Sequence, residues 1–295
     1  FNESENRVVL FSIAVIPILI IFSPLIKLFP VGLGLKMLVI STVFTVLLFG
    51  LLVPIFQQYK KHYKIAYLFL LIGLMALVSA TVHAGYAADR KQPTSIVYVL
   101  DANAAQAYWA SYNTKVSAFT HQFLGDNPTK GSYDTNTTAS KYKSNIKWHT
   151  NAEIKNLEKP VISITSDTII GAERNVKLSI FSNRNANKIE LLANEPIKFK
   201  SFEVNGALLK NTASKEYVLE INAGTIMSYF RTAENEQLNL NFVVDKNQKF
   251  DIDILEIKYD LFTNPEFSIA PRSEAMMPMP FVLNDATIIK TNLKF

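Results

Sequence analysis

The sequence contains no cysteine among its 295 residues. Disulfide bonds, thiolate catalysis and zinc sites built on cysteine are therefore excluded. A large extracytoplasmic domain without a disulfide is more typical of a bacterium than of a eukaryotic secretory compartment. Histidine is scarce as well: the four residues, His62, His83, His121 and His149, form no i, i+4 pair.

The common catalytic and nucleotide-binding motifs are also absent. The sequence has no HExxH, P-loop, GxSxG or GxGxxG, so it offers no ready metal, phosphate or nucleophile site. The net charge is +5, but the lysines are scattered and form no basic run interleaved with aromatic residues, so we expect no nucleic-acid partner. We assign no catalytic, cofactor-binding or metal-ligating residue from the sequence.

Charged residues are missing from three long apolar runs, residues 8–26, 37–56 and 65–82. Each has about 18–20 residues, enough for a helix to cross the roughly 30 Å hydrocarbon core of a bilayer. No acidic residue lies in any of them, which argues against an ion pathway and hence against a transporter subunit. Residues 1–85 are therefore predicted to be three transmembrane helices in a multi-pass membrane protein.

The loop between the second and third runs carries Lys60, Lys61 and Lys64. The positive-inside bias favours a cytoplasmic position for this loop. The third span then delivers Tyr86 and all that follows to the opposite side, the periplasm in a Gram-negative cell. Because the chain begins at Phe1 without Met or a signal-peptide pattern, we expect further protein upstream, with a number of spans that stays open.

The chain after residue 85 is polar and rich in strand patterns. Residues 86–160 are predicted to be a strand, helix and loop connection. Residues 95–100 are a continuous apolar run, typical of a strand buried on both faces, and residues 107–110 form a short aromatic segment. A helix is expected after Thr114 as its N-cap and before Gly125, and the Asn136 sequon is expected in a surface loop.

Residues 161–295 are predicted to be an antiparallel β-sandwich, because short apolar or alternating runs recur with turns between them. The runs cover 161–165, 176–180, 189–192, 197–199, 202–204, 217–221, 238–242 and 250–261. Asn205-Gly206 is the strongest hairpin signal. The alternation slips after Ile254, which predicts a β-bulge. The predicted fold is thus a three-helix membrane anchor followed by a mainly-β domain with one short helix.

Several histidine, tryptophan and acidic residues are candidates for a functional site. His83, at the end of the third span, is expected to be interfacial, with a ligand or relay role as its alternative. His121 is expected to be exposed, and Trp148-His149 to be a partly buried aromatic latch rather than a ligand pocket. Asp251 and Asp253, which share a strand face by their period-2 spacing, are expected to face solvent, so that they and Glu256 form no acid–base or metal site.

Several stretches, in this order and spacing after three spans, resemble the C-terminal part of membrane-anchored M28-type (aminopeptidase-like) zinc metallopeptidases. They are residues 97–101 with 107–109, 166–174, 204–206, and 271–280 with 285–287. Residues 256–261 depart from the turn that is frequent in the family. The resemblance implies a zinc exopeptidase domain upstream, in the same polypeptide, whose two-zinc centre activates water; none of its ligands falls on this chain.

Two function classes therefore stay open. The resemblance implies a non-catalytic membrane and extracytoplasmic portion of a zinc exopeptidase, with the lipid bilayer and the upstream catalytic domain as partners. The alternative is a membrane-tethered β-sandwich that binds a glycan or a protein without enzymatic activity, with Trp109, Trp148 and Tyr142 as stacking surfaces. The oligomeric state and the substrate stay open in both.

Overall fold

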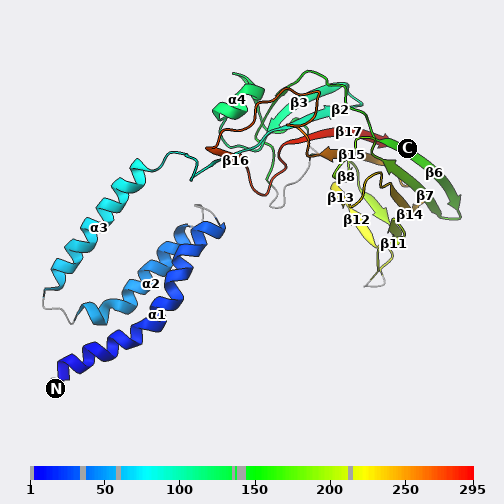
Figure 1. The fold of residues 1–295 in the computed structure, drawn as a ribbon. Helices are drawn as coiled ribbons and strands as arrows, with labels where there is room; N and C mark the ends of the chain where they lie inside the picture. The colour runs from blue at the N-terminus through cyan, green and yellow to red at the C-terminus, as the bar shows by residue number, and fades with distance from the viewer. Residues whose placement is uncertain (1–2, 34–37, 58–60, 135–136, 138–143, 212–214) are drawn as a thin grey trace. The chain divides into compact units, whose positions relative to one another are not determined.

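The computed structural model describes residues 3–33, 38–57, 61–134, 137, 144–211 and 215–295. The chain forms two compact units, Phe1–Gly85 and Tyr86–Phe295 (Figure 1). The Asn136 sequon and Tyr142 lie outside the described residues.

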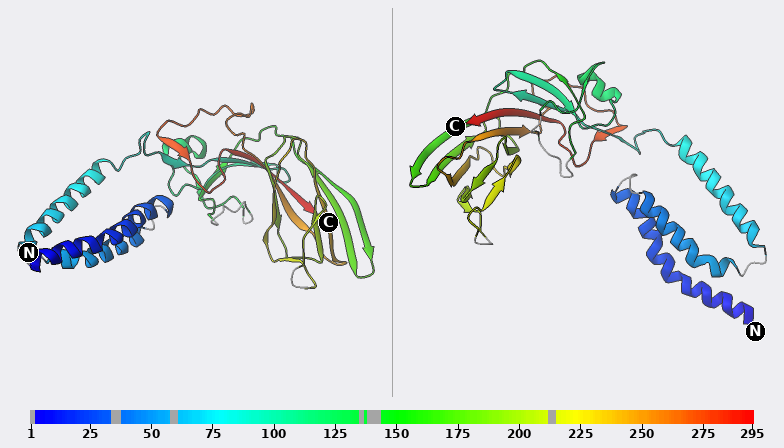
Figure 2. Two further views of the ribbon diagram at one scale, coloured as in Figure 1. Left: turned by 60° about the horizontal axis from the view of Figure 1, so that its bottom comes forward. Right: turned by 180° about the vertical axis from the view of Figure 1, so that it is seen from behind.

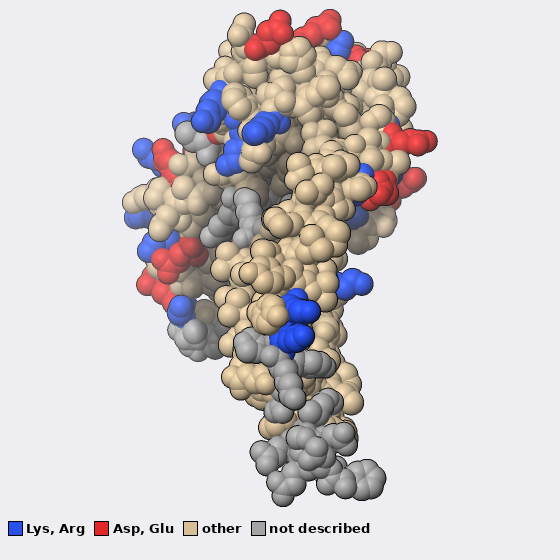
Figure 3. Space-filling view, turned by 90° about the vertical axis from the view of Figure 1, so that its left-hand side faces the viewer, with Lys and Arg blue, Asp and Glu red and all other residues tan. Residues whose placement is uncertain are grey.

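The first unit is helical, and its helices are α1 (Glu3–Leu33), α2 (Leu38–Phe56) and α3 (His62–Val82). Each contains a stretch long and apolar enough to cross a membrane: 9–31, Leu38–Phe56 and 63–82. The three predicted spans are thereby confirmed, with bounds shifted by a few residues. Figure 3 shows one face of this unit as uncharged surface interrupted by only a few lysine or arginine side chains.

Helices α1 and α2 pack through a small residue and aromatic rings. The Ser41 hydroxyl is buried and donates to the Ile26 carbonyl at 3.0 Å, and the Phe44 ring contacts the rings of Phe22 and Phe29. Small side chains let membrane helices approach closely, and a hydroxyl there replaces water as the partner of a carbonyl. The Phe69 ring of α3 contacts Phe49 of α2.

The described residues of the second unit form two large sheets and two small ones (Figure 1). The eight-stranded sheet has the order β13 (Gly224–Phe230), β8 (Lys188–Ala193), β15 (Asp251–Lys258), β17 (Ala286–Lys294), β2 (Val97–Asp101), β3 (Gln106–Ser111), β5 (Trp148–Asn151) and β4 (Thr129–Lys130). The five-stranded sheet has the order β11 (Ala207–Leu208), β10 (Ser201–Val204), β14 (Leu238–Asp245), β7 (Glu173–Phe181) and β6 (Val161–Ile170).

The two small sheets pair β1 (Gln92–Thr94) with β16 (Met276–Pro278) and β12 (Leu219–Ile221) with β9 (Ile197–Phe199). The pairs β17–β2 and β1–β16 are parallel, whereas the pairs within the five-stranded sheet are antiparallel. The eight-stranded sheet takes strands from both sides of residue 160, so residues 86–160 belong to the same unit as the rest.

The core is divided among three apolar clusters. The first lies between the large sheets and includes Leu178 of β7, Leu191 of β8, Phe242 of β14 and Ile254 of β15. This sheet-on-sheet packing is that of a sandwich. The second and third clusters lie on opposite faces of β2, with Val97 and Val99 in one and Tyr98 and Leu100 in the other, which confirms the prediction of a strand buried on both faces.

The predicted turn and helix-end residues are confirmed at some positions and wrong at others. Asn205 and Gly206 both have positive φ (47° and 84°) and connect β10 to β11, as predicted. Gly125 ends α4 (Ala118–Leu124), also as predicted, but Thr114 is not the N-cap. Ser117 caps α4, because its hydroxyl accepts from the Thr120 amide while the Thr120 hydroxyl accepts from the Ser117 amide, a reciprocal capping box.

The predicted β-bulge after Ile254 is wrong. Strand β15 pairs with β17 and with β8 in unbroken register from Asp251 and Ile252 onward. The run of apolar residues arises because both faces of this central strand are buried from Ile252 to Ile257, so alternation ends without a change in the backbone. The register shifts of the unit lie elsewhere, at 164/166 and 225/227.

Candidate functional site

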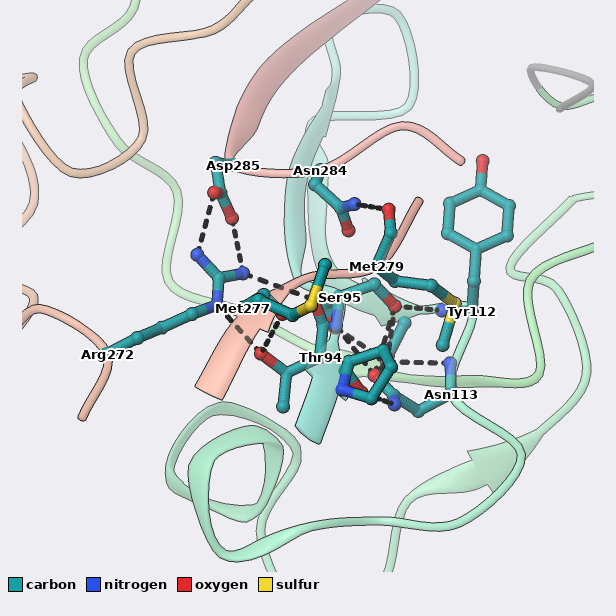
Figure 4. A network of polar contacts seen from close by, with 11 residues as sticks. Thr94, Ser95, Tyr112, Asn113, Arg272, Met277, Met279, Asn284 and Asp285 are labelled. Atoms are coloured by element: carbon teal, nitrogen blue, oxygen red, sulfur yellow. Dashed lines mark hydrogen bonds and ion pairs between the residues drawn. The ribbon is translucent and has the colours of Figure 1, made fainter. Parts of the chain in front are cut away.

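A buried polar network lies where β1 joins β16, β2 and the segment before β17 (Figure 4). Thr94, Ser95 and Ser111 are fully buried, and Asn113 is 7% exposed. Buried polar groups are costly unless they are hydrogen-bonded, so the partners of each group show what the network does. It has two halves, one around Arg272 and one around Ser95.

Arg272 reaches the network from the segment before β16. Its Nη1 and Nη2 donate to the two carboxylate oxygens of Asp285 at 2.7 and 2.5 Å. Its Nε donates to the Thr94 hydroxyl at 2.7 Å, and Nη2 also reaches the Thr94 carbonyl at 3.3 Å. The guanidinium lies 4.8 Å and 5.1 Å from the ring centroids of Phe119 and Phe262, within the range of cation–π attraction. Every nitrogen of Arg272 is thus engaged inside the protein.

The second half closes the turn after β3. The Ser95 amide donates to the Asn113 side-chain oxygen at 2.6 Å, and the Ser111 hydroxyl donates to the Ser95 carbonyl at 2.7 Å. The Asn113 amide group donates to the Pro93 carbonyl at 2.9 Å. These contacts satisfy the backbone of residues 93–95, where β1 gives way to β2, and fix that bend.

A shallow hollow of about 440 Å³ borders Arg272, lined among others by Lys91, Phe262, Ile269, Arg272, Met276 and Pro278. Its lining is mostly apolar. Because the donors of Arg272 are already used, this residue acts as a clamp that holds β1 and β16 against β17, and we assign it no proton-transfer or ligand-binding role. Arg272 and Glu274 are the only charged residues in the sequence 271–281. An arginine in so apolar a stretch is a sequence signal for a buried ion pair, which Arg272 forms with Asp285.

A second polar cluster surrounds Lys290 of β17. Its ammonium contacts Asp134, and lies 3.3 Å from Asp253 and 3.6 Å from Asp101. Burial lowers the pKa of Lys290, but the hydrogen bond to Asp134 and the nearby carboxylates outweigh it, so the pKa is raised. The lysine is therefore charged and serves as the counter-ion of three aspartates.

The prediction that Asp253 faces solvent is wrong. Asp251 and Asp253 do share a face of β15, but Asp253 is 3% exposed. Lys290 and Asn292 of the paired strand β17 bind Asp253, at 3.3 Å and 2.9 Å, and Tyr133 packs against the apolar cluster on this face. Period-2 spacing correctly assigns residues to one face; it does not say which segments cover that face.

Glu256 lies on the other face of β15 and is fully buried. The Ser182 hydroxyl donates to it, and Arg184 lies 3.4 Å away. Burial raises the pKa of Glu256, partly offset by the charge of Arg184. The sheet therefore separates Glu256 from Asp251 and Asp253, whereas the side chains of one metal or acid–base site would lie on the same face.

The histidines and tryptophans occupy separate places. The His83 ring contacts the Ser79 carbonyl at 2.8 Å, and His121 is exposed, as predicted, and lies 2.9 Å from Asp126. Trp148 and His149 are half-buried; the Trp148 indole donates to the Thr114 carbonyl at 3.4 Å. His149 contacts the Gly131 carbonyl at 3.0 Å. These bonds tie β5 to two loops, which fits the predicted latch.

Across the described residues, no group of three or more His, Asp or Glu side chains is arranged to hold a metal ion. This part of the chain therefore does not fit the ligand set of a two-zinc centre. Of the stretches that carry the peptidase resemblance, the first and last meet: β2 pairs with β17 from Val97 and Ala286 onward. Residues 166–174 and 204–206 lie in the five-stranded sheet. The sequence matches no known protein family and no curated protein.

Proposed function

We propose that this chain is the non-catalytic membrane and extracytoplasmic portion of an M28-like zinc exopeptidase. The three helices anchor the polypeptide, and peptide hydrolysis belongs to a domain upstream of Phe1. Zinc belongs to that domain as well. The β unit lies outside the cytoplasm, in the periplasm of a Gram-negative cell, and packs on the catalytic domain.

The observation that carries the proposal is the Arg272 clamp. It joins the strand that directly follows the last span, β1, to β17 through Thr94 and Asp285. Arg272 and Asp285 belong to the stretches that carry the resemblance, whereas Thr94 lies just before the first of them. A buried, fully bonded arginine at this point fixes the first strand of the β unit to its large sheet, so that the β unit can serve as a rigid surface for another domain.

A partner surface for the catalytic domain is available at β6, the edge strand of the five-stranded sheet. The β6–β7 hairpin projects at one end of the β unit (Figure 2). Ile164, Ile169 and Ile170 are 40%, 62% and 70% exposed. A long edge strand with exposed apolar side chains invites pairing and is usually covered in the native assembly.

The first test is the mass and metal content of the native polypeptide. The protein is extracted from membranes with antibodies against residues 86–295, and its intact mass and zinc content are measured on one sample. A chain much heavier than 33.2 kDa that carries about two zinc ions, as a two-metal hydrolase would, supports the proposal. A chain of this mass without zinc contradicts it.

The role of the β unit needs its own test. The full enzyme and a variant lacking residues 86–295 are compared for aminopeptidase activity and for thermal unfolding of the catalytic domain. We expect the deletion to reduce both. Unchanged activity and unchanged unfolding would contradict the packing role.

The orientation is tested with single cysteines, because the chain has none of its own. Leu208→Cys lies in the β unit, and Lys61→Cys lies in the loop assigned to the cytoplasm. In intact cells, a membrane-impermeant maleimide is expected to label the first and not the second. The reverse pattern would overturn the assigned orientation.

A membrane-tethered binding module is the second candidate. Trp109 contacts the rings of Tyr98, Phe123 and Phe267 and belongs to the core. Trp148 is half-buried on β5 and is the better stacking surface for a glycan. Glycan-array binding that is lost in Trp148→Ala, in a protein without zinc, would favour this candidate.

A further inference from the structure

The open edges of the two large sheets differ in length. Among the strands that the structure describes, β11 and β4 are edge strands of two residues each, and β13 has seven residues with a register shift between 225 and 227. Short or bulged edge strands resist pairing with another chain. Strand β6 has ten residues and pairs only with β7, so it offers the longest unpaired backbone edge of these two sheets.

The last part of β6 is regular enough to receive a further strand. A register shift lies between Ile164 and Ser166, but from Ser166 to Ile170 each residue pairs in turn with one residue of β7. In an antiparallel run of this kind, alternate residues direct their backbone N–H and C=O groups away from the paired strand. In the described part of the chain, no strand pairs with those groups of residues 166–170.

Strand β6 also lacks the residues that usually protect an edge. It contains no lysine and no proline, and Asp167 is its only charged residue. Arg174 of β7 donates to both carboxylate oxygens of Asp167, at 2.8 and 2.5 Å, so this charge is neutralised within the hairpin. Edge strands of natural proteins commonly carry lysine, proline or a free charge that opposes pairing. Residues 166–170 present none of these.

The exposed side chains at the end of β6 distinguish two ways of covering it. Ile169 and Ile170 are neighbours on a strand, so their side chains point to opposite faces of the sheet, and they are 62% and 70% exposed. A partner laid on one face of the sheet would cover one of these side chains and leave the other in water. A strand paired alongside β6 covers both, because its own side chains alternate between the same two faces.

We propose that an extended segment of the upstream catalytic domain adds to β6 as a further strand of the five-stranded sheet. This inference rests on the proposed function and names the kind of contact: backbone hydrogen bonds to residues 166–170, with apolar side chains beside Ile169 and Ile170. The facing residues of that segment are expected to be uncharged, because Arg174 already neutralises Asp167. Backbone bonds of this kind give affinity, and side chains at alternate positions give specificity.

Hydrogen exchange tests the added strand directly. The full polypeptide purified from membranes and the chain of residues 1–295 are compared in the same detergent, by mass spectrometry with fragmentation that resolves the single amides of residues 166–170. A paired strand protects the alternate amides that point away from β7, whereas contact through side chains alone does not produce this pattern. We expect those amides to exchange about tenfold more slowly, or slower still, in the full polypeptide.

Two variants of the full polypeptide supply the control. Thr168→Lys places a charge in the middle of the proposed contact, and Leu208→Lys places one on β11, the opposite edge of the same sheet. Both positions are exposed, so we expect neither change to unfold the β unit, and circular dichroism verifies this. Thr168→Lys is expected to return the amides of residues 166–170 to the exchange rates of the 1–295 chain, whereas Leu208→Lys leaves them protected. Protection that survives Thr168→Lys would overturn the proposal.

The mass and zinc content of the same sample separate this inference from the proposed function. A polypeptide of 33.2 kDa without zinc contradicts both, because no upstream strand exists. A heavier, zinc-bearing polypeptide whose amides at 166–170 exchange as fast as in the 1–295 chain overturns the added strand alone. Equal protection in the full polypeptide and in the 1–295 chain, rising with protein concentration, also overturns it, since a second copy of the chain would then occupy β6.

Discussion

Arg272 and Asp285 form a two-pronged ion pair, with N–O distances of 2.7 and 2.5 Å, while the same guanidinium also binds Thr94. Their side chains are only 9% and 24% exposed. Thr94 is 178 residues away from Arg272 in the sequence. A pair that joins such distant segments holds β1, at the start of the β unit, against the large sheet.

Replacing Asp285 by asparagine tests this clamp. Asparagine fits the site and tolerates the positive φ of 56°, so only the charge is lost. We expect the free energy of unfolding of the β unit to fall by about 2–4 kcal/mol, because a mostly buried arginine loses its counter-ion. Guanidinium titration of the chain in detergent micelles, followed by tryptophan fluorescence, measures it. Glu220→Gln breaks the half-exposed pair with Lys198 and is expected to leave stability unchanged. Equal effects in both variants would contradict the role of the clamp.

Replacing Lys290 by methionine tests the second cluster. Methionine keeps the length and apolar packing, but Asp253, whose side chain is 4% exposed, is left among other carboxylates. We expect a loss of about 3 kcal/mol, typical of breaking a buried pair. Lys198→Met is the control, since the side chain of Lys198 and that of its partner Glu220 are 51% and 50% exposed. Chemical denaturation compares the two, and a stability for Lys290→Met equal to that of the wild type would show that the cluster contributes nothing.

The ionisation of Asp251 is expected to make the stability of the fold depend on pH. Hydrogen bonds from Lys294, then Asn292 and Asn194, lower the pKa of Asp251 to about 2, below the usual value of about 3.9. The ionised form therefore stabilises the fold above the usual pKa, and this contribution is lost as pH falls from about 4 to about 2. Asp251→Asn is expected to be less stable than the wild type at pH 7 and equal to it near pH 2. A constant difference at every pH would refute the assignment.

A side chain added at Gly206, in the Asn205–Gly206 turn, is expected to strain the backbone and lower the stability of the fold. Gly206 has φ +84°, where a β-branched side chain is strained, so Gly206→Val is expected to cost about 1–2 kcal/mol. Gly85→Ala is the control, since a methyl group there meets none of the described atoms within 4 Å and no positive φ is involved. Thermal unfolding separates the two variants, and a loss in the control alone would contradict the argument.

Local chemistry made much of the fold predictable. Three uncharged runs specify the spans, the Asn205-Gly206 pair specifies its hairpin, and a run such as 97–100 specifies a strand buried on both faces. The misplaced N-cap of α4 is a local error, whereas the other two errors come from long-range contacts. Asp253 reads as a solvent-facing residue until Lys290 and Asn292 of β17 are placed beside it. The slipped alternation after Ile254 likewise arises from sheet layers and not from a bulge.

The candidate site was the least predictable part. Its residues come from β1, the turn after β3, the segment before β16 and the start of β17, and parallel pairing of β17 with β2 brings them together. Parallel pairing leaves no short turn signal in a sequence. In the sequence, Arg272 belongs only to a stretch that carries the family resemblance. Its role as a clamp depends on its partners Thr94 and Asp285, which the structure brings together.

The central position of β17 has a consequence for biosynthesis. This strand lies between β15 and β2 (Figure 1), and it also meets the start of the β unit through the Asn103–Asn292 hydrogen bond, whose residues are 189 apart in the sequence. Until residues 286–294 have been synthesised, β2 and β15 have no common neighbour and the large sheet exists only as two halves. A premature stop before β17 leaves both inner edges open, and such products are the ones that quality-control proteases and chaperones are expected to recognise.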